Sequence, residues 1–228
     1  MRRTEKAEQI FARLARANPS PKGELDHVNP YTLLVAVVLS AQATDKGVNR
    51  ATAGLFKVVT TPRQMLDLGE DGLVQHIKSI GLFRAKAKNV IKLSQDLIDH
   101  HGGEVPQTRD ELEKLPGVGR KTANVVLNMA FGQATMAVDT HVFRVSQRLG
   151  LAKGKTPLAI EEQLLKVVPE KFMQHAHHWL ILHGRYTCLA RGPRCAQCPL
   201  EDLCTFKGKS NTAPAPPRSA KPARKKSK

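Results

Sequence analysis

Apolar residues recur along most of the chain at intervals of three and four positions, the spacing that places them on one face of an α-helix. One such run contains Ala87, Val90, Ile91, Leu97 and Ile98. No segment of comparable length alternates between apolar and polar residues as a half-buried strand does. The sequence therefore predicts an all-α protein, with helices near 3–17, 30–41, 45–58, 62–68, 71–78, 84–101, 108–115, 119–131, 140–149, 157–167 and 171–186.

Threonines mark the starts of three of these helices. Thr61 and Thr156 each precede a proline, which is favoured in the first helical turn because an N–H there has no partner within the helix. Thr61 is followed three residues later by Gln64, and Thr108 by Glu111, so both starts have the form of a capping box.

The chain is strongly basic, with 36 Lys and Arg against 20 Asp and Glu and a formal net charge of +16. Such an excess indicates a polyanionic partner, nucleic acid before anionic membrane. Residues 205–228 hold eight of the basic residues and no acid, which leaves 16 − 8 = +8 on the rest. Because this end is also rich in Pro, Ala and Ser, we expect 207–228 to be a disordered arm that attracts phosphates weakly or only aids solubility.

No membrane segment is expected. The first 14 residues are charged throughout and lack the apolar core of a signal peptide. The longest apolar run, 31–39, is far shorter than the roughly 20 residues that cross a bilayer. We expect a cytoplasmic protein that acts as a monomer.

A short connection between two predicted helices carries two glycines, in the run Leu115-Pro116-Gly117-Val118-Gly119-Arg120-Lys121. The glycines provide a turn that needs positive φ or close approach of the backbone. The helix that begins near Gly119 offers free N–H groups and a partial positive charge, which bind phosphate. With Arg120 and Lys121 beside it, we predict a DNA-binding helix-hairpin-helix rather than an ordinary tight connection.

Lys121 has two interpretations, a further phosphate contact or a nucleophile. An amine attacks carbon only when unprotonated, and the neighbouring Arg120 cation and helix N-terminus both favour the neutral form. Asp139 is the candidate partner, because it precedes the predicted helix 140–149 as an N-cap residue. A capping carboxylate is fixed and ionised, which suits a group that stabilises developing positive charge.

The four cysteines form one cluster, Cys188-x6-Cys195-x2-Cys198-x5-Cys204. Disulfides are disfavoured in a cytoplasmic protein, so the cluster indicates a metal site. Zinc sites commonly use two close pairs, whereas only Cys195 and Cys198 are a close pair here, which favours iron–sulfur while leaving zinc open. Three basic residues near the first two cysteines offer guanidinium groups to phosphates: Arg185, Arg191 and Arg194.

Together these segments resemble the helix-hairpin-helix DNA glycosylases, and within them the iron–sulfur endonuclease III family. The resemblance rests on the hairpin run continued to Asn124, on Val138-Asp139-Thr140-His141, on the cysteine spacing, on Leu39-Ser40-Ala41-Gln42-Ala43-Thr44-Asp45 and on His177-His178-Trp179-Leu180-Ile181-Leu182-His183-Gly184-Arg185. It covers about residues 3–206. Some members have a lysine where this chain has Gly192, and the basic end extends beyond the family core.

The resemblance implies two all-α lobes with a DNA groove between them. One is a six-helix barrel over 23–133 that contains the hairpin. The other combines 1–22 with 134–206 and holds a 4Fe-4S cluster on Cys188, Cys195, Cys198 and Cys204. In that arrangement Lys121 and Asp139 face each other from different lobes.

The same resemblance implies a bifunctional DNA glycosylase and lyase of base excision repair, acting at the nucleoid on double-stranded DNA with damaged pyrimidines or abasic sites. Lys121 would form a Schiff base with the sugar, Gln42 would pair with the orphaned base, and Leu82 would wedge between bases. From the pattern alone, Gln42 is a polar residue at a helix end and Leu82 a core leucine. Contacts to the DNA backbone are assigned to Gly117, Val118, Gly119, Arg120, Arg191 and Arg194.

Two rival functions fit parts of the sequence. A monofunctional adenine glycosylase of the same superfamily would share the barrel and the cluster, but such enzymes lack a lysine at the place of Lys121 and carry an additional C-terminal domain. A non-catalytic iron–sulfur protein that binds DNA is the rival from another class. Covalent trapping on DNA distinguishes it from the lyase.

Overall fold

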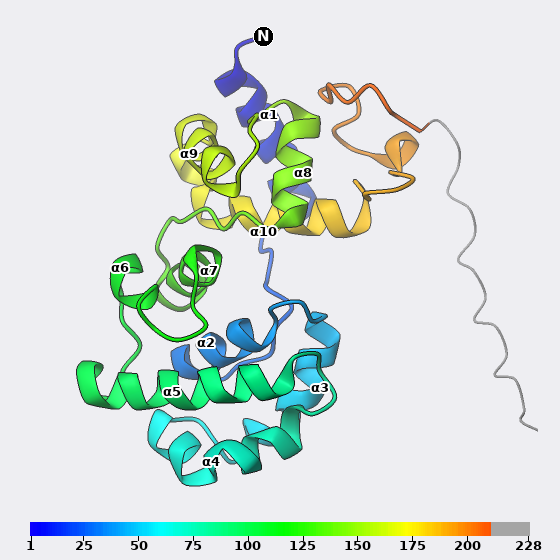
Figure 1. The fold of residues 1–228 in the computed structure, drawn as a ribbon. Helices are drawn as coiled ribbons and strands as arrows, with labels where there is room; N and C mark the ends of the chain where they lie inside the picture. Colours follow the sequence, from blue (N-terminus) through cyan, green and yellow to red (C-terminus); the bar gives the residue numbers. More distant parts are fainter. Residues whose placement is uncertain (211–228) are drawn as a thin grey trace, which may run out of the picture.

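The computed structural model describes residues 1–210 and confirms the all-α class (Figure 1). These residues form ten α-helices, one short 3-10 helix and no strand. The elements are α1 (Arg3–Ala17), α2 (Pro30–Leu39), α3 (Asp45–Leu55), α4 (Pro62–Ile77), α5 (Phe83–His101), α6 (Arg109–Leu112), α7 (Arg120–Phe131), α8 (Thr140–Leu149), α9 (Pro157–Val167), α10 (Glu170–Tyr186) and η1 (Cys195–Gln197). None of these helices is long and apolar enough to cross a membrane.

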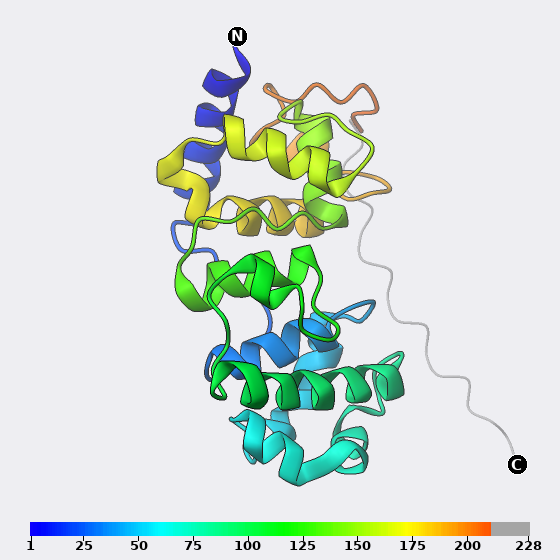
Figure 2. The ribbon, with the colours of Figure 1, turned by 60° about the vertical axis from the view of Figure 1, so that its left-hand side comes forward.

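The helices form two bundles, each around its own hydrophobic core (Figures 1 and 2). The first bundle contains α2 to α7, and the buried residues of its core lie between Tyr31 and Leu127. The second bundle contains α1, α8, α9 and α10, and its core draws on Ala7–Leu14 together with Met136–Leu203. Helix α1 therefore packs against elements from the opposite end of the chain. Helix α10 lies along the boundary between the two bundles (Figure 1).

Helix starts follow the threonine pattern, with one correction. The Thr61 hydroxyl accepts from the Gln64 N–H at 3.3 Å and the Gln64 side chain accepts from the Thr61 N–H at 3.2 Å, so this capping box is complete. At α6 only half of the box forms. The Thr108 hydroxyl accepts from the Glu111 N–H, as in a capping box. The Glu111 carboxylate, however, accepts from the Thr108 hydroxyl at 2.7 Å and not from the Thr108 N–H, so the second bond of the box is missing.

Two breaks in helices bear on the site. The predicted break after residue 68 is confirmed inside α4, where Gly69 has φ 72° and ψ 170°. Helix α2 ends at Leu39, two residues before its predicted end, because the chain leaves helical geometry and reaches φ 53° at Gln42. That turn brings Gln42 and the start of α3 out beside the boundary between the bundles.

Polar bonds fix the two bundles against each other. Asn128 on α7 donates its amide to the Gln174 carbonyl at 3.1 Å, and the Gln174 amide donates back to the Asn128 carbonyl at 3.2 Å. A small apolar cluster lies beside this pair and consists of Leu33, Val37, Val125 and Ala137. These reciprocal bonds link α7 of the first bundle directly to α10 of the second.

Most of the predicted basic arm falls outside the described residues, which stop at residue 210. The part that is described is not free. Lys209 donates to the carbonyl of Glu201 at 2.8 Å and pairs with its carboxylate at 2.7 Å. The contact means that the start of the predicted arm is tied to the cysteine segment.

Candidate active site

A cleft of about 740 Å³ opens where the two bundles meet. Lys121, in the first turn of α7, lines it from the first bundle, and Asp139, at the start of α8, lines it from the second. Gln42 and Arg185 lie on the same cleft. The fold thus brings Lys121 and Asp139 into one site.

Asp139 is held by the helix that it caps, as the sequence predicted. Its Oδ1 accepts hydrogen bonds from the N–H groups of His141 and Val142, both at 2.8 Å. The other carboxylate oxygen, Oδ2, makes no hydrogen bond within residues 1–210. A half-buried carboxylate with one fixed and one free oxygen is a rigid negative group beside the cleft.

Asp45 is a second carboxylate of the cleft, and the sequence reasoning gave it no role of its own. It is the first residue of α3, and its Oδ2 pairs with Nη1 of Arg185 at 2.6 Å. Burial raises the pKa of Asp45, the positive charge of Lys121 opposes that rise, and the negative charge of Asp139 adds to it. Lys121, Asp139 and Asp45 line the same cleft, so the charge of each acts on the others. The sequence signal that could have drawn attention to Asp45 is Thr44, the N-cap residue directly before it, which places Asp45 at a helix start.

Arg185 does not lie where the sequence suggested. It was expected beside the cysteines as a phosphate contact, but it ion-pairs with Asp45 and with Glu24, and Tyr186 donates its hydroxyl to Glu24 as well. The Arg185 side chain is 27% exposed and the Asp45 side chain 18%. Arg185 therefore links α10 to the first bundle across the cleft and has little capacity left for DNA.

The two hairpin glycines serve different purposes. Gly117 has φ +79°, and a Cβ there would lie 3.1 Å from Asn89 and 3.2 Å from Val38, so the fold itself requires glycine. Gly119 has an ordinary extended φ of −107°, and a Cβ there would meet nothing within 4 Å. Neither backbone strain nor packing requires glycine at position 119, and the missing side chain leaves the start of α7 open to close approach by a ligand.

Helix α7 begins at Gly119 without a side-chain cap. Nothing in residues 1–210 accepts from the N–H groups of Gly119 and Arg120, so the helix presents free donors and a partial positive charge to solvent. Val118 is different. Its side chain is buried in the first core and its N–H donates to the Leu115 carbonyl at 3.0 Å, so Val118 shapes the turn, and its expected contact with DNA stays a prediction.

Arg120 is also occupied within the protein. Its Nε and Nη2 donate to the two carboxylate oxygens of Glu161 on α9, at 2.8 and 2.9 Å. The Glu161 side chain is only 4% exposed, against 40% for Arg120. These two hydrogen bonds link the hairpin to the second bundle, and the phosphate contact expected of Arg120 stays a prediction. The cation thought to act on Lys121 is largely neutralised by this partner.

Gln42 and Leu82 share an unusual backbone. They are the two non-glycine residues with positive φ in the described part of the chain, at 53° and 59°. Leu82 is 61% exposed, which is inconsistent with a core leucine, and Gln42 lies in an exposed turn beyond the end of α2. Left-handed geometry costs free energy at a side-chain-bearing residue, and such costs concentrate at functional sites. Both residues therefore stand out as candidates for contact with a ligand.

The four cysteines gather around a pocket of about 20 Å³ in the C-terminal loop. All are half-buried free thiols. Burial raises the pKa of Cys198 to about 11, and the other three thiols act in the same direction. Within residues 1–210, no three His, Cys, Asp or Glu side chains form a group suited to a single metal ion.

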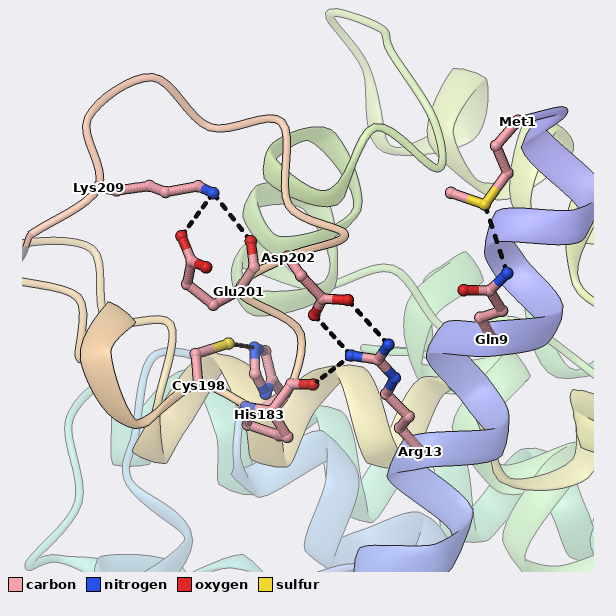
Figure 3. Close-up of polar contacts among 9 residues, drawn as sticks. Met1, Gln9, Arg13, His183, Cys198, Glu201, Asp202 and Lys209 are labelled. Atoms are coloured by element: carbon pink, nitrogen blue, oxygen red, sulfur yellow. Dashed lines mark hydrogen bonds and ion pairs between the residues drawn. The ribbon is translucent and has the colours of Figure 1, made fainter.

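Polar contacts hold this loop to the second bundle (Figure 3). Arg13 on α1 donates to both carboxylate oxygens of Asp202, at 2.6 and 2.9 Å, and lowers the pKa of that carboxyl. Nε2 of buried His183 lies 3.7 Å from Cys198 Sγ. Arg191 and Arg194 are exposed, and their side chains make no hydrogen bond or ion pair within residues 1–210. Their guanidinium groups remain available for a ligand.

These features match a known class of protein. Residues 35–170, more than half of the chain, match the family model of the HhH-GPD superfamily base excision DNA repair proteins. The chain belongs to this superfamily.

Within it, the chain is similar to several endonucleases III. That of Haemophilus influenzae is 60% identical over 209 residues, covering 92% of this chain and 99% of the relative. That of Escherichia coli is 58% identical over 201 residues, covering 88% and 95%. A trapped covalent intermediate between endonuclease III and DNA superposes with a TM-score of 0.84 at 48% identity, covering 90% of this chain and 97% of that one. A non-covalent endonuclease III–DNA complex matches with the same score.

Proposed function

We propose that the cleft between the bundles excises damaged pyrimidine bases from double-stranded DNA and then cleaves the strand 3′ to the abasic site. As a member of the endonuclease III family, the protein is a DNA glycosylase and DNA-(apurinic or apyrimidinic site) lyase of base excision repair. The observation that carries the proposal is the placement of Lys121 and Asp139 on opposite sides of one cleft.

The first chemical step requires the damaged nucleotide to leave the base stack, because its sugar cannot be reached inside the duplex. The unprotonated Lys121 amine attacks C1′ of the sugar. The bond from C1′ to the base breaks, and the base leaves with the bonding electrons and takes up a proton. Asp139 supports this step because its free Oδ2 faces no competing donor, so the carboxylate can stabilise the positive charge that develops at C1′.

The second step follows from the covalent bond. The adduct loses the ring oxygen from C1′ and becomes a protonated Schiff base, which acidifies the protons on C2′. Loss of one C2′ proton breaks the bond from C3′ to oxygen, and the 3′ phosphate leaves. Water then hydrolyses the Schiff base and restores Lys121.

DNA binding is assigned to groups that the protein leaves free. We propose that the uncapped N-terminus of α7 at Gly119 binds a backbone phosphate, that Gln42 and Leu82 enter the space left by the extruded base, and that Arg191 and Arg194 contact phosphates. Gly117 maintains the turn. The enzyme acts as a monomer, with the first bundle corresponding to a lobe over 23–133 and the second to 1–22 with 134–206.

A 4Fe-4S cluster fits the four cysteines better than zinc does. Four sulfurs around one zinc ion lie within about 4 Å of one another, given a Zn–S distance of ~2.3 Å, and the described residues hold no such compact group. All four cysteines line one common pocket, which is the arrangement that a cluster held by four thiolates needs. When bound, the cluster supplies metal–sulfur links that hold the loop carrying Arg191 and Arg194. Iron and sulfide analysis tests this, and stoichiometric zinc without iron contradicts it.

Borohydride trapping tests the reaction. With an abasic duplex, the intact chain gives a reduced covalent adduct, and Lys121→Gln gives none. Lys155→Gln is the matched control, because Lys155 lines the same cleft and its loss leaves the adduct in place. Asp139→Asn slows turnover while DNA affinity stays within about threefold. Absence of any adduct from the intact chain refutes the lyase and leaves a non-catalytic DNA-binding protein.

A further inference from the structure

A recess of about 70 Å³ continues from the cleft toward α10. The two spaces share six lining residues, which are Val37, Ser40, Asp45, Lys121, Asp139 and Arg185. Beyond these, the recess is enclosed mainly by the segment 22–25 and by two histidines of α10, His177 and His178. Its volume suits the edge of a planar base rather than a whole base, while the adjoining cleft has room for the remainder.

Both histidines have ring nitrogens without partners. His178 is 9% exposed, and neither Nδ1 nor Nε2 makes a hydrogen bond within residues 1–210. His177 is 1% exposed, and its Nδ1 is unpaired as well. Buried polar groups are nearly always satisfied in folded proteins, because leaving them unpaired costs free energy. A site that keeps such atoms beside a nucleophile is suited to a ligand that pairs with them.

The His178 ring is neutral at physiological pH, because burial lowers its pKa to about 4. A neutral imidazole has one N–H donor and one acceptor nitrogen. It can therefore donate to a carbonyl oxygen or accept from a ring N–H. Pyrimidine derivatives, whether oxidised or fragmented, present these two groups side by side.

Gly23 leaves space next to the same ring. A Cβ at Gly23 would lie 3.6 Å from His178 Nε2 and 2.5 Å from the terminal methyl of Met129. Gly23 is not among the residues with positive φ, so the backbone does not demand glycine. The missing side chain leaves space beside Nε2 of His178, an atom that is itself buried in the described structure, and a base edge would occupy that space.

We propose that His178 is a specificity-determining residue, whose Nε2 hydrogen-bonds to the carbonyl and N–H edge of the extruded pyrimidine-derived base in the recess. The inference rests on the proposed function, because it assigns the base-reading part of that same site. His178 acts on the base and not on the sugar. It therefore contributes to base removal and has no part in cleavage at a site that has already lost its base.

Two substrates separate these roles. With a duplex containing dihydrouracil or thymine glycol, His178→Leu lowers the single-turnover rate of base release about ten- to a hundredfold, the loss expected for one or two hydrogen bonds. With an abasic duplex, the same variant cleaves within twofold of the intact chain. His178→Gln places an amide near the position of Nε2 and restores at least part of the base release.

Gly23→Ala provides a second variant that does not remove the histidine. Its methyl displaces only the flexible end of Met129, so the chain folds, and it narrows the approach to Nε2. It lowers base release and spares abasic cleavage. His175→Leu is the matched control, because His175 packs on Trp179 at 5.6 Å, does not line the recess, and leaves both rates unchanged.

Equal losses on both substrates in the His178 variants overturn the proposal and make the residue structural. Unchanged rates on both overturn it as well. Failure of the proposed function has a different signature, since the intact chain then cleaves neither substrate.

Discussion

The bond between Arg120 and Glu161 makes an asymmetric prediction about its two partners. Arg120→Met removes the cation and leaves a carboxylate that is 4% exposed with no partner. Glu161→Gln leaves an Arg120 side chain that is 40% exposed and can turn toward water, and the new amide oxygen still accepts one of its N–H groups. Losing the arginine should therefore destabilise the protein more than neutralising the glutamate.

The magnitudes follow from burial. Breaking a buried ion pair by removing one partner costs about 3–5 kcal/mol. Because water reaches the arginine side of this pair, we take the lower end, about 3 kcal/mol, for Arg120→Met. Glu161→Gln loses one charge-assisted hydrogen bond and keeps another, about 1 kcal/mol. For a chain of this size the expected falls in Tm are roughly 6–12 °C and 2–4 °C.

The same pair makes a prediction for DNA binding. Because Arg120 is occupied by Glu161, Arg120→Met leaves the dependence of log K on log salt concentration unchanged. Glu161→Gln frees a cation beside the proposed phosphate site and steepens that slope by about 0.9. Thermal unfolding and fluorescence anisotropy on an abasic-analogue duplex measure both effects. Equal losses of Tm, or a slope that flattens by about one unit in Arg120→Met alone, would refute the reasoning.

Three further predictions concern the backbone and the buried histidine. Gly117→Ala should lower Tm, because positive φ at an alanine costs about 1–2 kcal/mol. Gly119→Ala should keep Tm but weaken DNA binding. The reverse pattern in thermal melts and binding assays would contradict the roles assigned to the two glycines. Leu82→Gly removes an exposed side chain from left-handed geometry, so Tm stays or rises while base release slows; a clear fall in Tm would show that Leu82 supports the core. Burial lowers the pKa of His178 in the folded protein to about 4, below the ordinary value of about 6.5 that it has in the unfolded chain. As the pH falls from 7 to 4, the unfolded chain therefore binds a proton at His178 more readily than the folded protein does, which lowers the free energy of unfolding by about 3 kcal/mol. Thermal melts of His178→Gln should lack this part of the acid sensitivity, and identical profiles for variant and parent would contradict it.

Local rules predicted the helices well because their signals lie within a few residues. Thr61 with Gln64 and Asp139 with its following N–H groups form the caps that the sequence indicates. The break at Gly69 follows equally from one residue. These features depend on neighbours along the chain, so the pattern of residue types is sufficient to locate them.

Partners far apart in sequence were not predictable in the same way. Arg120 was assigned to phosphate on the basis of its position in the hairpin, yet its partner is Glu161, 41 positions away. Arg185 was assigned to the cysteine loop, yet it pairs with Asp45, 140 positions away. A basic residue has the same appearance in sequence whether it binds a ligand or an acid of the same chain. The choice depends on packing between elements, which residue types alone do not specify.

The division of the second bundle between the two ends of the chain has a consequence for synthesis on the ribosome. Helix α1 is translated before the first bundle, but its apolar face of Ala7, Ile10, Phe11 and Leu14 packs against residues 136–203, which are translated after that bundle. The first bundle is complete once Phe131 has emerged, so it can form while α1 is still unpaired. A nascent chain therefore exposes an amphipathic helix at its N-terminus throughout most of translation. We expect chaperones that hold apolar segments to bind there until the cysteine loop has been made.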